Sequence, residues 1–446
     1  MEKLFGTDGI RGVANQALTP ELAFQIGRIT ASLLKGKDQR PLILVGRDTR
    51  LSGGMLEGSL AAGIASTGVD VQLLGVISTP AVAFITRKVK ANAGVVISAS
   101  HNPIEDNGLK IFNRQGLKLS QRLEQQIEQI YFSGRDPFSR AVGAGVGQVY
   151  HNPAPVSYYL DYLKQQGPDL KGLRVVVDCG HGAACHIAPE IFCSLGATVK
   201  VIHESPDGSL INVDCGATSP GRLSREVVQW RGDIGLAFDG DADRLIAVDE
   251  QGQVVDGDAI MAICALEMVS KGLLNHNTLV VTVMSNGGLE LLGKQRGFTV
   301  LRTPVGDRFV LAKMLEGGYN LGGEQSGHII FTDHCTTGDG LLTALQMLKA
   351  VQVQDRPFSE LAAVLPRFPQ VLVNRQVSST AGWQSNKTIA SKIAELKQRL
   401  GQPSQILVRP SGTEPVIRVM LEAPISEDEL WEQAQALAEV IAQELN

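Results

Sequence analysis

The stretch PLILVGRDTRLSGGMLEGSLAAGIASTGVDVQLLG (Pro41–Gly75) decides the fold. It opens on the apolar run PLILVG and closes on VDVQLLG, and both runs are typical of short buried strands. The segment between them, LEGSLAAGIASTG, has the pattern of a helix. Strands that alternate with helices are typical of βαβ units, so this stretch predicts a mainly parallel sheet.

The same alternation occurs in three rounds along the chain. The first round continues through AGVVIS (Ala93–Ser98), and the second contains LRVVVDC, ATVKVIH and IGLAF between Leu173 and Phe238. The third contains TLVVTVMS and FTVLRT between Thr278 and Thr303. These rounds predict an α/β protein with three similar domains, each built on a mixed or parallel sheet.

The C-terminal part has a different pattern, which predicts a small α+β domain. The strand-like runs QVLVNRQV and QILVRPSGTEPVIRVMLEA precede a helix that starts near Ser426 and carries a capping box with Glu429. The apolar stripe of that helix consists of Leu430, Ala434, Leu437 and Ile441. We place the four domains at residues 1–150, 151–256, 257–366 and 367–446.

Composition and charge limit the classes of protein that this chain can be. Of its 446 residues, 43% are hydrophobic and 20% are charged, as in soluble globular proteins. No apolar run approaches the ~18 residues of a membrane span, and the start MEKLFGTDGIRG lacks the apolar core of a signal peptide. No Lys/Arg run suggests a nucleic-acid surface, and the net charge of −5 means that local groups must hold any anionic ligand. We therefore expect a cytoplasmic protein that binds neither membranes nor nucleic acid.

The six cysteines do not suggest a disulfide framework. The segment DCGHGAACH brings Cys179, His181, Cys185 and His186 close together in sequence. Their spacing matches none of the usual tetrahedral zinc patterns. We therefore interpret the segment as a strand, a Gly-rich turn and the start of a helix.

Three carboxylates dominate the loop in IGLAFDGDADRLIAVDE. Asp239, Asp241 and Asp243 alternate after an apolar strand, and carboxylates this close repel one another unless a cation compensates them. Oxygen ligands without His or Cys favour Mg²⁺ or Ca²⁺. An EF-hand is excluded because Arg244 stands where its sixth position requires Gly. A solvated acidic turn is the weaker alternative, because Arg244 has an obvious use beside a phosphate–metal complex.

A second loop, in LVRPSGTEPVIRVM, has the groups that a phosphate needs. Arg409, Ser411, Gly412 and Thr413 lie between two apolar runs, and Arg418 follows. Hydroxyls, backbone N–H groups around Gly and bidentate guanidinium groups all bind phosphate. A plain Pro-Ser-Gly turn is the alternative, and it leaves the paired arginines unexplained.

A third loop, in LGGEQSGHIIF, has groups that suit a sugar. Glu324 and Ser326 are flanked by glycines, and a carboxylate and a hydroxyl can bind sugar hydroxyl groups. A simple hairpin turn, with His328 as a satisfied core histidine, is the alternative.

The fourth loop, in SASHNPIEDNGLKIF, offers Ser98 and Ser100 as nucleophiles. A serine hydrolase would carry G-x-S-x-G or a triad in a known order, and neither is evident. With a metal loop and a phosphate loop in the same chain, phosphoryl transfer is favoured. Mg²⁺ would neutralise charge on the transferring group, and Lys110 or His101 would manage the proton.

Five motifs in order, FGTDGIRG, SASHNP, DGDADR, GGEQSGH and RPSGTEP, resemble those of the α-D-phosphohexomutases over essentially the whole chain. The resemblance implies four domains around a central cleft, with one loop from each. Within the family, KLFGTDGIRG, TPVGDR (Thr303–Arg308) and GEQSGH favour the branch that interconverts glucosamine 6-phosphate and glucosamine 1-phosphate. That reaction uses a phosphoserine enzyme and a sugar 1,6-bisphosphate, and serves UDP-N-acetylglucosamine and cell-wall synthesis.

The resemblance also implies roles for individual residues. Ser100 would be the phosphoserine, and Lys110 the general base, with His101 and His328 in reserve. One Mg²⁺ would bind a phosphoserine oxygen and the three aspartates of DGDADR, and Arg244 would stabilise the transferring phosphoryl group. Thr7 and Arg11 would lie beside Ser100. The residues expected to bind substrate are Thr7, Thr303, Gly306, Asp307, Glu324 and Ser326, together with Arg409, Ser411, Gly412, Thr413 and Arg418 of the phosphate loop.

Other functions remain open at this point. A phosphoglucomutase or phosphomannomutase would share every motif above. An Asp-nucleophile phosphatase would use AFDGDAD, although Asp243 stands where Thr or Val is usual. A sugar-phosphate sensor would not need three carboxylates beside a serine. The expected partner is a phosphorylated hexosamine, and a homodimer is possible.

Overall fold

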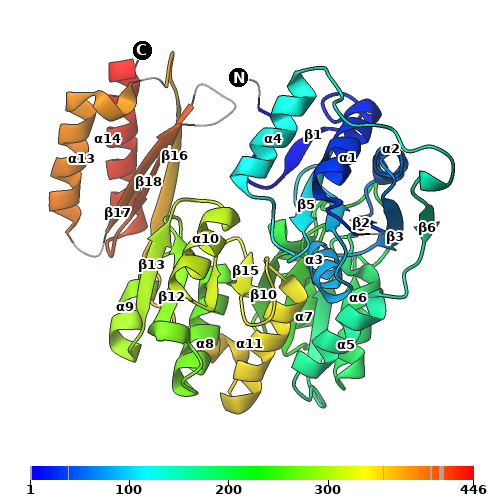
Figure 1. Cartoon of the computed structure of the whole chain (residues 1–446). Coiled ribbons are helices and arrows are strands. Elements are labelled where there is room, and N and C mark those ends of the chain that lie inside the picture. Colours follow the sequence, from blue (N-terminus) through cyan, green and yellow to red (C-terminus); the bar gives the residue numbers. More distant parts are fainter. Residues whose placement is uncertain are drawn as a thin grey trace. The chain divides into compact units, whose positions relative to one another are not determined.

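The computed structural model describes residues 3–38, 40–354, 356–380, 382–401, 404–410 and 416–445. It divides into two compact units, Met1–Thr282 with Leu301–Ala363, and Val283–Val300 with Val364–Asn446. The first unit holds three α/β sheets, and the second holds an antiparallel sheet with helices (Figure 1). The predicted fold class is therefore confirmed, whereas the four domain boundaries stay a prediction.

The first sheet contains the stretch Pro41–Gly75 as the predicted strand, helix and strand. Its strand order is β1-β5-β4-β2-β3-β6; β2 is parallel to β3 and β4, and β4–β5 and β5–β1 are antiparallel. The strands are Ile10–Val13 (β1), Leu42–Arg47 (β2), Asp70–Val76 (β3), Ala93–Ile97 (β4), Asp106–Asn113 (β5) and Val149–His151 (β6). The helices are Pro20–Leu34 (α1), Gly53–Ala65 (α2), Thr79–Lys88 (α3) and Gln121–Phe132 (α4), with a 3₁₀ turn at Gly143–Gly145.

Helices cover both faces of this sheet, which is why its central strands read as unbroken apolar runs. Ile43 and Val45 of β2 belong to the core cluster that α1, α2 and α4 share. Gly46 faces the other way, where an added Cβ would lie 2.7 Å from a methyl group of Val82 in α3. The alternation of successive side chains between the two faces produces this division.

The second sheet has the order β11-β10-β9-β7-β8, with β9–β7–β8 parallel and β9–β10–β11 antiparallel. The predicted strand, turn and helix around DCGHGAACH is confirmed, because β7 ends at Asp178 and α6 starts at Ala184. The strands are Arg174–Asp178 (β7), Thr198–Ile202 (β8), Ile234–Phe238 (β9), Leu245–Asp249 (β10) and Val254–Val255 (β11). The helices are Val156–Gln166 (α5), Ala184–Ser194 (α6) and Gly221–Trp230 (α7), with a 3₁₀ turn at Gly216–Thr218.

The third sheet has the order β13-β12-β14-β15, in which β12–β14 is parallel and β14–β15 antiparallel. Its strands are Thr278–Thr282 (β12), Thr299–Thr303 (β13), Leu321–Gly323 (β14) and Ile329–Phe331 (β15). The accompanying helices are Gly257–Ser270 (α8), Asp307–Gly317 (α10), Gly340–Gln354 (α11) and Phe358–Ala362 (α12), with a 3₁₀ turn at Asn275–Asn277.

The fourth sheet is antiparallel in the order β16-β18-β17 and belongs to the second unit. The predicted stripe of the last helix is buried against it, and the Oγ of Ser426 accepts a hydrogen bond from the Glu429 N–H at 3.3 Å. Its strands are Gln370–Gln376 (β16), Gln405–Pro410 (β17) and Val416–Glu422 (β18). The helices of this unit are Gly288–Arg296 (α9), Lys387–Leu400 (α13) and Glu427–Leu445 (α14), with a 3₁₀ turn at Trp383–Ser385.

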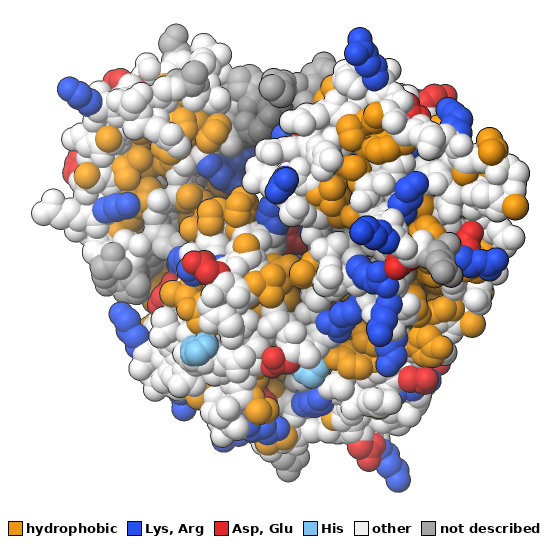
Figure 2. Space-filling view, viewed as in Figure 1, with side chains coloured by type: hydrophobic (Ala, Val, Ile, Leu, Met, Phe, Trp, Pro, Cys, Tyr) orange, Lys and Arg blue, Asp and Glu red, His pale blue; other side chains and the backbone are white. Residues whose placement is uncertain are grey.

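The molecular surface agrees with the mild net charge. On the face seen in Figure 2, lysine and arginine side chains are interspersed with acidic and apolar ones. Within the described ranges, no helix combines the length and the apolar character that crossing a membrane requires.

Candidate active site

Three of the four predicted loops occupy equivalent places in their sheets, and they meet within the first unit. The loops 98–105, 239–244 and 324–328 each join an antiparallel strand pair: β4–β5, β9–β10 and β14–β15 respectively. Ser100 Oγ lies 2.6 Å from Asp239, and the Leu245 N–H donates to the carbonyl of Gly327 at 3.0 Å. The repeated architecture therefore delivers a hydroxyl loop, a carboxylate loop and a sugar loop to one place.

Ser100 has the geometry of a strained, buried nucleophile. Its side chain is 1% exposed, and its φ of 53° lies in the left-handed region that non-glycine residues rarely adopt. Such a conformation costs about 1–3 kcal/mol and persists only where the surroundings impose it. The hydroxyl donates to Asp239 at 2.6 Å, and the Nδ1 of His101 is 3.2 Å away. Ser98, by contrast, uses its hydroxyl to donate to Asp48 at 2.6 Å.

Asp239, Asp241 and Asp243 form the metal-ligand cluster that the sequence predicts. One oxygen from each lies within 4.8 Å of the others, and all three side chains are buried. The Oδ1 atoms of Asp241 and Asp243 are buried without a hydrogen-bond partner among the described residues. Burial and the two neighbouring carboxylates raise the pKa of Asp239 well above its ordinary value. This oxygen-only, self-repelling set fits a hard divalent cation.

Lys110 lies on β5 and closes one side of the triad. Its Nζ donates to Asp241 at 2.7 Å and to Asp243 at 2.9 Å, and it lies 3.1 Å from Asp8. Burial lowers the pKa of Lys110, but the three carboxylates raise it by more than burial lowers it. The pKa is therefore well above its ordinary value. With these partners Lys110 is a cation, and it can act as a base only after its carboxylate partners are engaged elsewhere.

The other predicted groups of the catalytic centre lie around the triad and the serine loop. The Nε of Arg244 is 4.0 Å from Asp239 and 3.9 Å from Asp243. Arg11 donates to the side chain of Asn102 in the serine loop at 3.0 Å. Burial, together with Arg244 and Arg11, lowers the pKa of His101 to about 4, so this imidazole is neutral at pH 7. The structure thus brings Arg11, His101 and Arg244 together with Ser100.

His328 and Asp307 are tied into the same network from the third sheet. The Nδ1 of His328 lies 3.5 Å from Asp243, and its Nε2 accepts the N–H of Gly338 at 3.0 Å and lies 3.4 Å from Asp307. Burial lowers the pKa of His328, and Asp243 more than offsets this, so that the pKa is raised. Asp307 accepts a hydrogen bond from Lys118, which also bonds Asp8. The carboxylate of Asp307 is therefore engaged within the protein.

The predicted sugar-binding residues have mixed surroundings. The Oε1 of Glu324 accepts the N–H of Gly306 at 3.0 Å, and the Oγ of Ser326 has no hydrogen-bond partner among the described residues. Thr303 turns its hydroxyl to the carbonyls of Val281 and Pro304, at 3.3 and 3.1 Å. Thr7 is exposed. Glu324 and Ser326 thus have free hydrogen-bonding capacity, whereas the hydroxyl of Thr303 is used internally.

The predicted phosphate loop lies in the second unit. Ser411, Gly412 and Thr413 lie outside the described residues. Arg409 on β17 is the direct register partner of Arg418 on β18, and the Nε of Arg418 is buried without a hydrogen-bond partner among the described residues. Like charges placed directly opposite each other destabilise a sheet, so this pair favours an anion between or beside them.

The structure adds residues that the sequence analysis missed. Asp8 pairs with Lys110 and with Lys118, and Lys118 also pairs with Asp307. Thr79, at the start of α3, donates a hydrogen bond to Asp241. Asp8 stands within FGTDGIRG and could have been found there, whereas nothing near Lys118 or Thr79 marks them in the sequence. Long-range contacts alone reveal these two.

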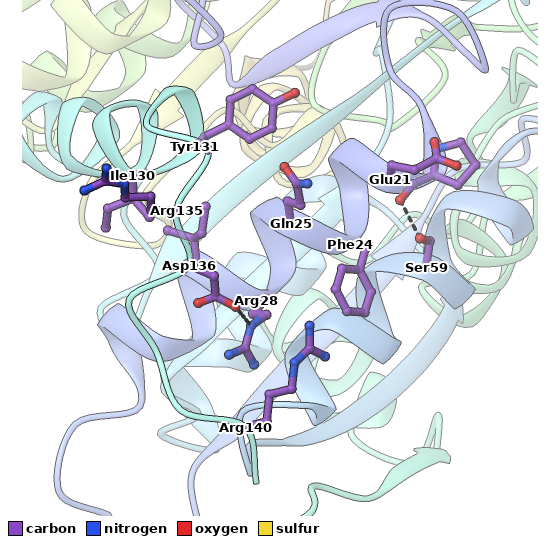
Figure 3. A pocket seen from close by; sticks show the side chains of 13 residues that line it. Glu21, Phe24, Gln25, Arg28, Ser59, Ile130, Tyr131, Arg135, Asp136 and Arg140 are labelled. Carbon is purple, nitrogen blue, oxygen red and sulfur yellow. Dashed lines mark hydrogen bonds and ion pairs between the residues drawn. The ribbon is translucent and has the colours of Figure 1, made fainter.

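A pocket elsewhere in the first unit contains none of the predicted site residues. It lies between α1 and the end of α4, and its lining includes Phe24, Arg28, Tyr131 and Asp136 (Figure 3). The cysteine–histidine segment, which the structure describes throughout, does not form a metal-ligand cluster. Its Cys179 is buried, whereas its His186 is exposed. Among the residues that the structure describes, the three aspartates form the only cluster with metal-ligand geometry.

Comparison with known proteins gives one consistent result. Family descriptions of phosphoglucomutase/phosphomannomutase alpha/beta/alpha domains I, II and III match residues 2–137, 157–252 and 256–368, and the C-terminal domain matches 372–440. A phosphoglucosamine mutase from Alkaliphilus oremlandii is 50% identical over 450 residues, with 100% of both chains covered.

Solved structures agree with this at the level of the fold. A phosphoglucomutase/phosphomannomutase family protein from Burkholderia thailandensis has a TM-score of 0.82 at 25% identity, covering 98% of this chain and 97% of that one. An Aspergillus fumigatus N-acetylphosphoglucosamine mutase, solved with GlcNAc-6P and magnesium, has a TM-score of 0.69 at 18% identity, covering 99% and 96%.

Proposed function

The chain belongs to the phosphoglucomutase/phosphomannomutase family, and we propose from this premise that it is a phosphoglucosamine mutase, an isomerase that interconverts glucosamine 6-phosphate and glucosamine 1-phosphate. The full-length identity of 50% to a phosphoglucosamine mutase supports this branch of the family. The reaction would supply UDP-N-acetylglucosamine for cell-wall synthesis.

One observation carries the proposed chemistry. The Ser100 hydroxyl is buried, held in a left-handed turn, and placed 2.6 Å from the first carboxylate of the triad. A hydroxyl in an ordinary loop would be solvated and free to rotate. This arrangement instead favours a covalent route, in which Ser100 carries the phosphoryl group.

The steps can be written with residues of this chain. The substrate hydroxyl attacks phosphorus, the bond between phosphorus and Ser100 Oγ breaks, and a new bond to the sugar oxygen forms, giving a sugar 1,6-bisphosphate. The hydroxyl proton goes to Lys110, which becomes a neutral base once its carboxylate partners are engaged elsewhere, or to His101 or His328 in reserve. The bisphosphate then turns round, and Ser100 Oγ attacks the phosphorus at the other end. The bond between that phosphorus and its sugar oxygen breaks, and the base returns its proton to the sugar oxygen. Arg244 and Arg11 would stabilise the negative charge on the group in transit.

The triad and Ser100 are the residues that would hold Mg²⁺. Asp239, Asp241 and Asp243 offer oxygen ligands, and two of their oxygens are buried without a partner among the described residues. When bound, Mg²⁺ neutralises charge on the phosphoryl group. Lys110 of β5 and Thr79 of α3 both donate hydrogen bonds to Asp241 and so orient that ligand.

Substrate recognition would use two groups of residues. Glu324 and Ser326 would bind the sugar, and Arg409 and Arg418, with Ser411, Gly412 and Thr413, would bind the phosphate that is not transferred. The 2-amino group of the substrate calls for a carboxylate partner, and Asp307 already accepts a bond from Lys118. Glu324 is therefore the better partner for that amine. The cytoplasmic location and the homodimer stay predictions.

A side-by-side assay tests the function. With a sugar bisphosphate as activator, we expect kcat/KM for glucosamine phosphates to exceed that for glucose and mannose phosphates by roughly tenfold or more, the value of one charge-assisted hydrogen bond. Equal or reversed preference would place the chain on the phosphoglucomutase/phosphomannomutase branch. An acid-labile phosphoryl group on Asp239 would instead indicate an aspartate nucleophile, because acyl phosphates do not survive acid.

A further inference from the structure

A buried arginine outside all of the predicted motifs donates hydrogen bonds to the serine loop, residues 98–105. Arg50 follows β2 in the segment VGRDTR, and its side chain is 0% exposed. Its guanidinium group donates to four backbone carbonyls of this loop and of the start of β5. Nη2 reaches the carbonyls of Ser100 at 3.1 Å and Asn102 at 2.8 Å, and Nη1 reaches those of Asp106 at 2.9 Å and Pro103.

The remaining donor of Arg50 completes a second set of contacts. Its Nε donates to Asp48 at 3.0 Å, so that all five N–H donors of the guanidinium group are used. Asp48 also accepts the hydroxyl of Ser98 at 2.6 Å, and the Oγ of Ser98 in turn accepts the N–H of Ser100 at 2.9 Å. Burial raises the pKa of Asp48 to about 6, and the carboxylate is therefore mainly ionised at pH 7.

Ser100 is therefore held through both of its backbone polar groups. Its carbonyl accepts from Arg50 and, at 2.8 Å, from Asn212 of the second sheet's domain, while its N–H donates to Ser98. A serine at a φ of 53° returns to ordinary conformations unless its neighbours prevent it. Arg50 and Ser98 supply that restraint without touching the hydroxyl itself.

We propose that Arg50, together with Asp48 and Ser98, is a positioning residue that holds the Ser100 hydroxyl on the aspartate triad for phosphoryl transfer. The inference rests on the proposed mutase function. Because Arg50 and Ser98 contact Ser100 only through its backbone, they orient the reacting atom without binding the substrate. Their loss should then lower kcat far more than it changes KM.

A second buried arginine, Arg28, provides a matched control for Arg50, because its contacts are purely structural. Arg28 of α1 is 3% exposed and pairs with Asp136 (Figure 3). It also donates to Ser66 and to the carbonyls of Phe138 and Ser139. It lies in the same domain, and it contacts neither the serine loop nor the triad. Arg28→Lys and Arg50→Lys therefore make the same chemical change in two comparable environments.

The experiment compares Arg50→Lys, Ser98→Ala and Arg28→Lys with the unmodified protein. We measure thermal stability, kcat and KM for glucosamine 6-phosphate, and the rate at which Ser100 takes up a phosphoryl group from the sugar bisphosphate. Lysine keeps the charge but lacks the planar fork that spans four carbonyls. We expect Arg50→Lys and Ser98→Ala to lower kcat and the phosphorylation rate by ten- to a hundredfold with KM within about twofold, in line with the cost of misplacing a reacting group. Arg28→Lys should lower the Tm and leave both rates unchanged.

Two outcomes would overturn the inference. One is wild-type kcat in Ser98→Ala and in whatever Arg50→Lys protein folds. The other is an equal loss of kcat in Arg28→Lys for an equal loss of Tm. If Arg50→Lys does not fold, Ser98→Ala decides. Failure of the proposed function is recognised separately, because the unmodified protein would then show no preference for glucosamine phosphates over glucose and mannose phosphates.

Discussion

At the scale of single residues, Ser100 combines chemical and conformational demands. In the proposed reaction the hydroxyl faces the triad, and it does so from a left-handed backbone that serine tolerates poorly. Glycine would adopt the same backbone without strain, but it has no nucleophile. The residue therefore carries a conformational cost that only its chemistry justifies.

A pair of substitutions at Ser100 separates these two effects. We expect both Ser100→Ala and Ser100→Gly to lose nearly all mutase activity, because the covalent route disappears. Ser100→Gly should be the more stable of the two by about 1–2 kcal/mol, since only glycine relieves the left-handed strain. Denaturant unfolding and phosphopeptide mapping of the active protein provide the measurements. Activity in Ser100→Ala, or a phosphoryl group on Ser98, would show that the nucleophile is elsewhere.

Lys110 tests the proton-transfer step. We expect Lys110→Met to slow single-turnover phosphoryl transfer while Ser100 stays phosphorylated. The variant also leaves Asp241 and Asp243 without their common partner, so the assay requires saturating Mg²⁺ to compensate those charges. A transfer rate equal to that of the unmodified protein would instead assign the proton to His101 or His328.

At the scale of elements, the antiparallel hairpin explains how a loop that carries several charges is held rigid. The metal loop connects β9 and β10, every residue of which is buried, so the two strands fix the loop at both ends. Three carboxylates held this way repel one another, and the rigid strands prevent them from spreading apart. A bound cation should thus stabilise the fold as well as the reaction.

This metal effect has a readout that does not depend on activity. Mg²⁺ at 100 times its Kd should stabilise the protein by about 2.7 kcal/mol, raising the Tm, and a chelator should reverse the change. Asp241→Asn should greatly reduce the Mg²⁺-dependent shift. Asp249→Asn is the matched control, because Asp249 is a buried aspartate on β10 that accepts two backbone N–H groups and lies outside the triad. An equal Mg²⁺ shift in both variants would contradict the assignment.

At the scale of the whole molecule, each compact unit carries its own set of predicted site residues. Ser100, the triad and the sugar loop belong to the first unit, and the opposed arginines of β17 and β18 belong to the second. The proposed function assigns the phosphoryl chemistry to residues of the first unit and the phosphate recognition to residues of the second. Substitutions in the second unit should affect binding more than chemistry.

Arg418 tests this division. We expect Arg418→Met to raise KM for the sugar phosphate by about tenfold, the equivalent of about 1.4 kcal/mol, with a smaller change in kcat. Arg375→Met is the control on the same sheet, because the side chain of Arg375 is 43% exposed and pairs only weakly with Glu439 at 3.5 Å. A loss of kcat at unchanged KM in Arg418→Met would place this arginine in the chemical step.

The sequence by itself determined the fold class and indicated the candidate reactive groups. Apolar runs that alternate with helices required the α/β sheets, and the residues of each motif are adjacent in the chain, so their chemistry could be recognised locally. The same reason explains three further correct predictions. They are the strand that precedes Ser100, the strand, turn and helix around Cys179, and the apolar stripe of α14. Local pattern determines these features because each depends on neighbours a few residues away.

Only the tertiary structure decided which groups meet and in what state. Lys118 and Thr79 contact the site from sequence separations of 189 and 162 residues, and Arg50 holds Ser100 from 50 residues away. The structure also showed that Asp307 is already engaged and that three carboxylates raise the pKa of Lys110. Such facts depend on burial and on charges brought together by folding, and a linear pattern of residue types contains neither.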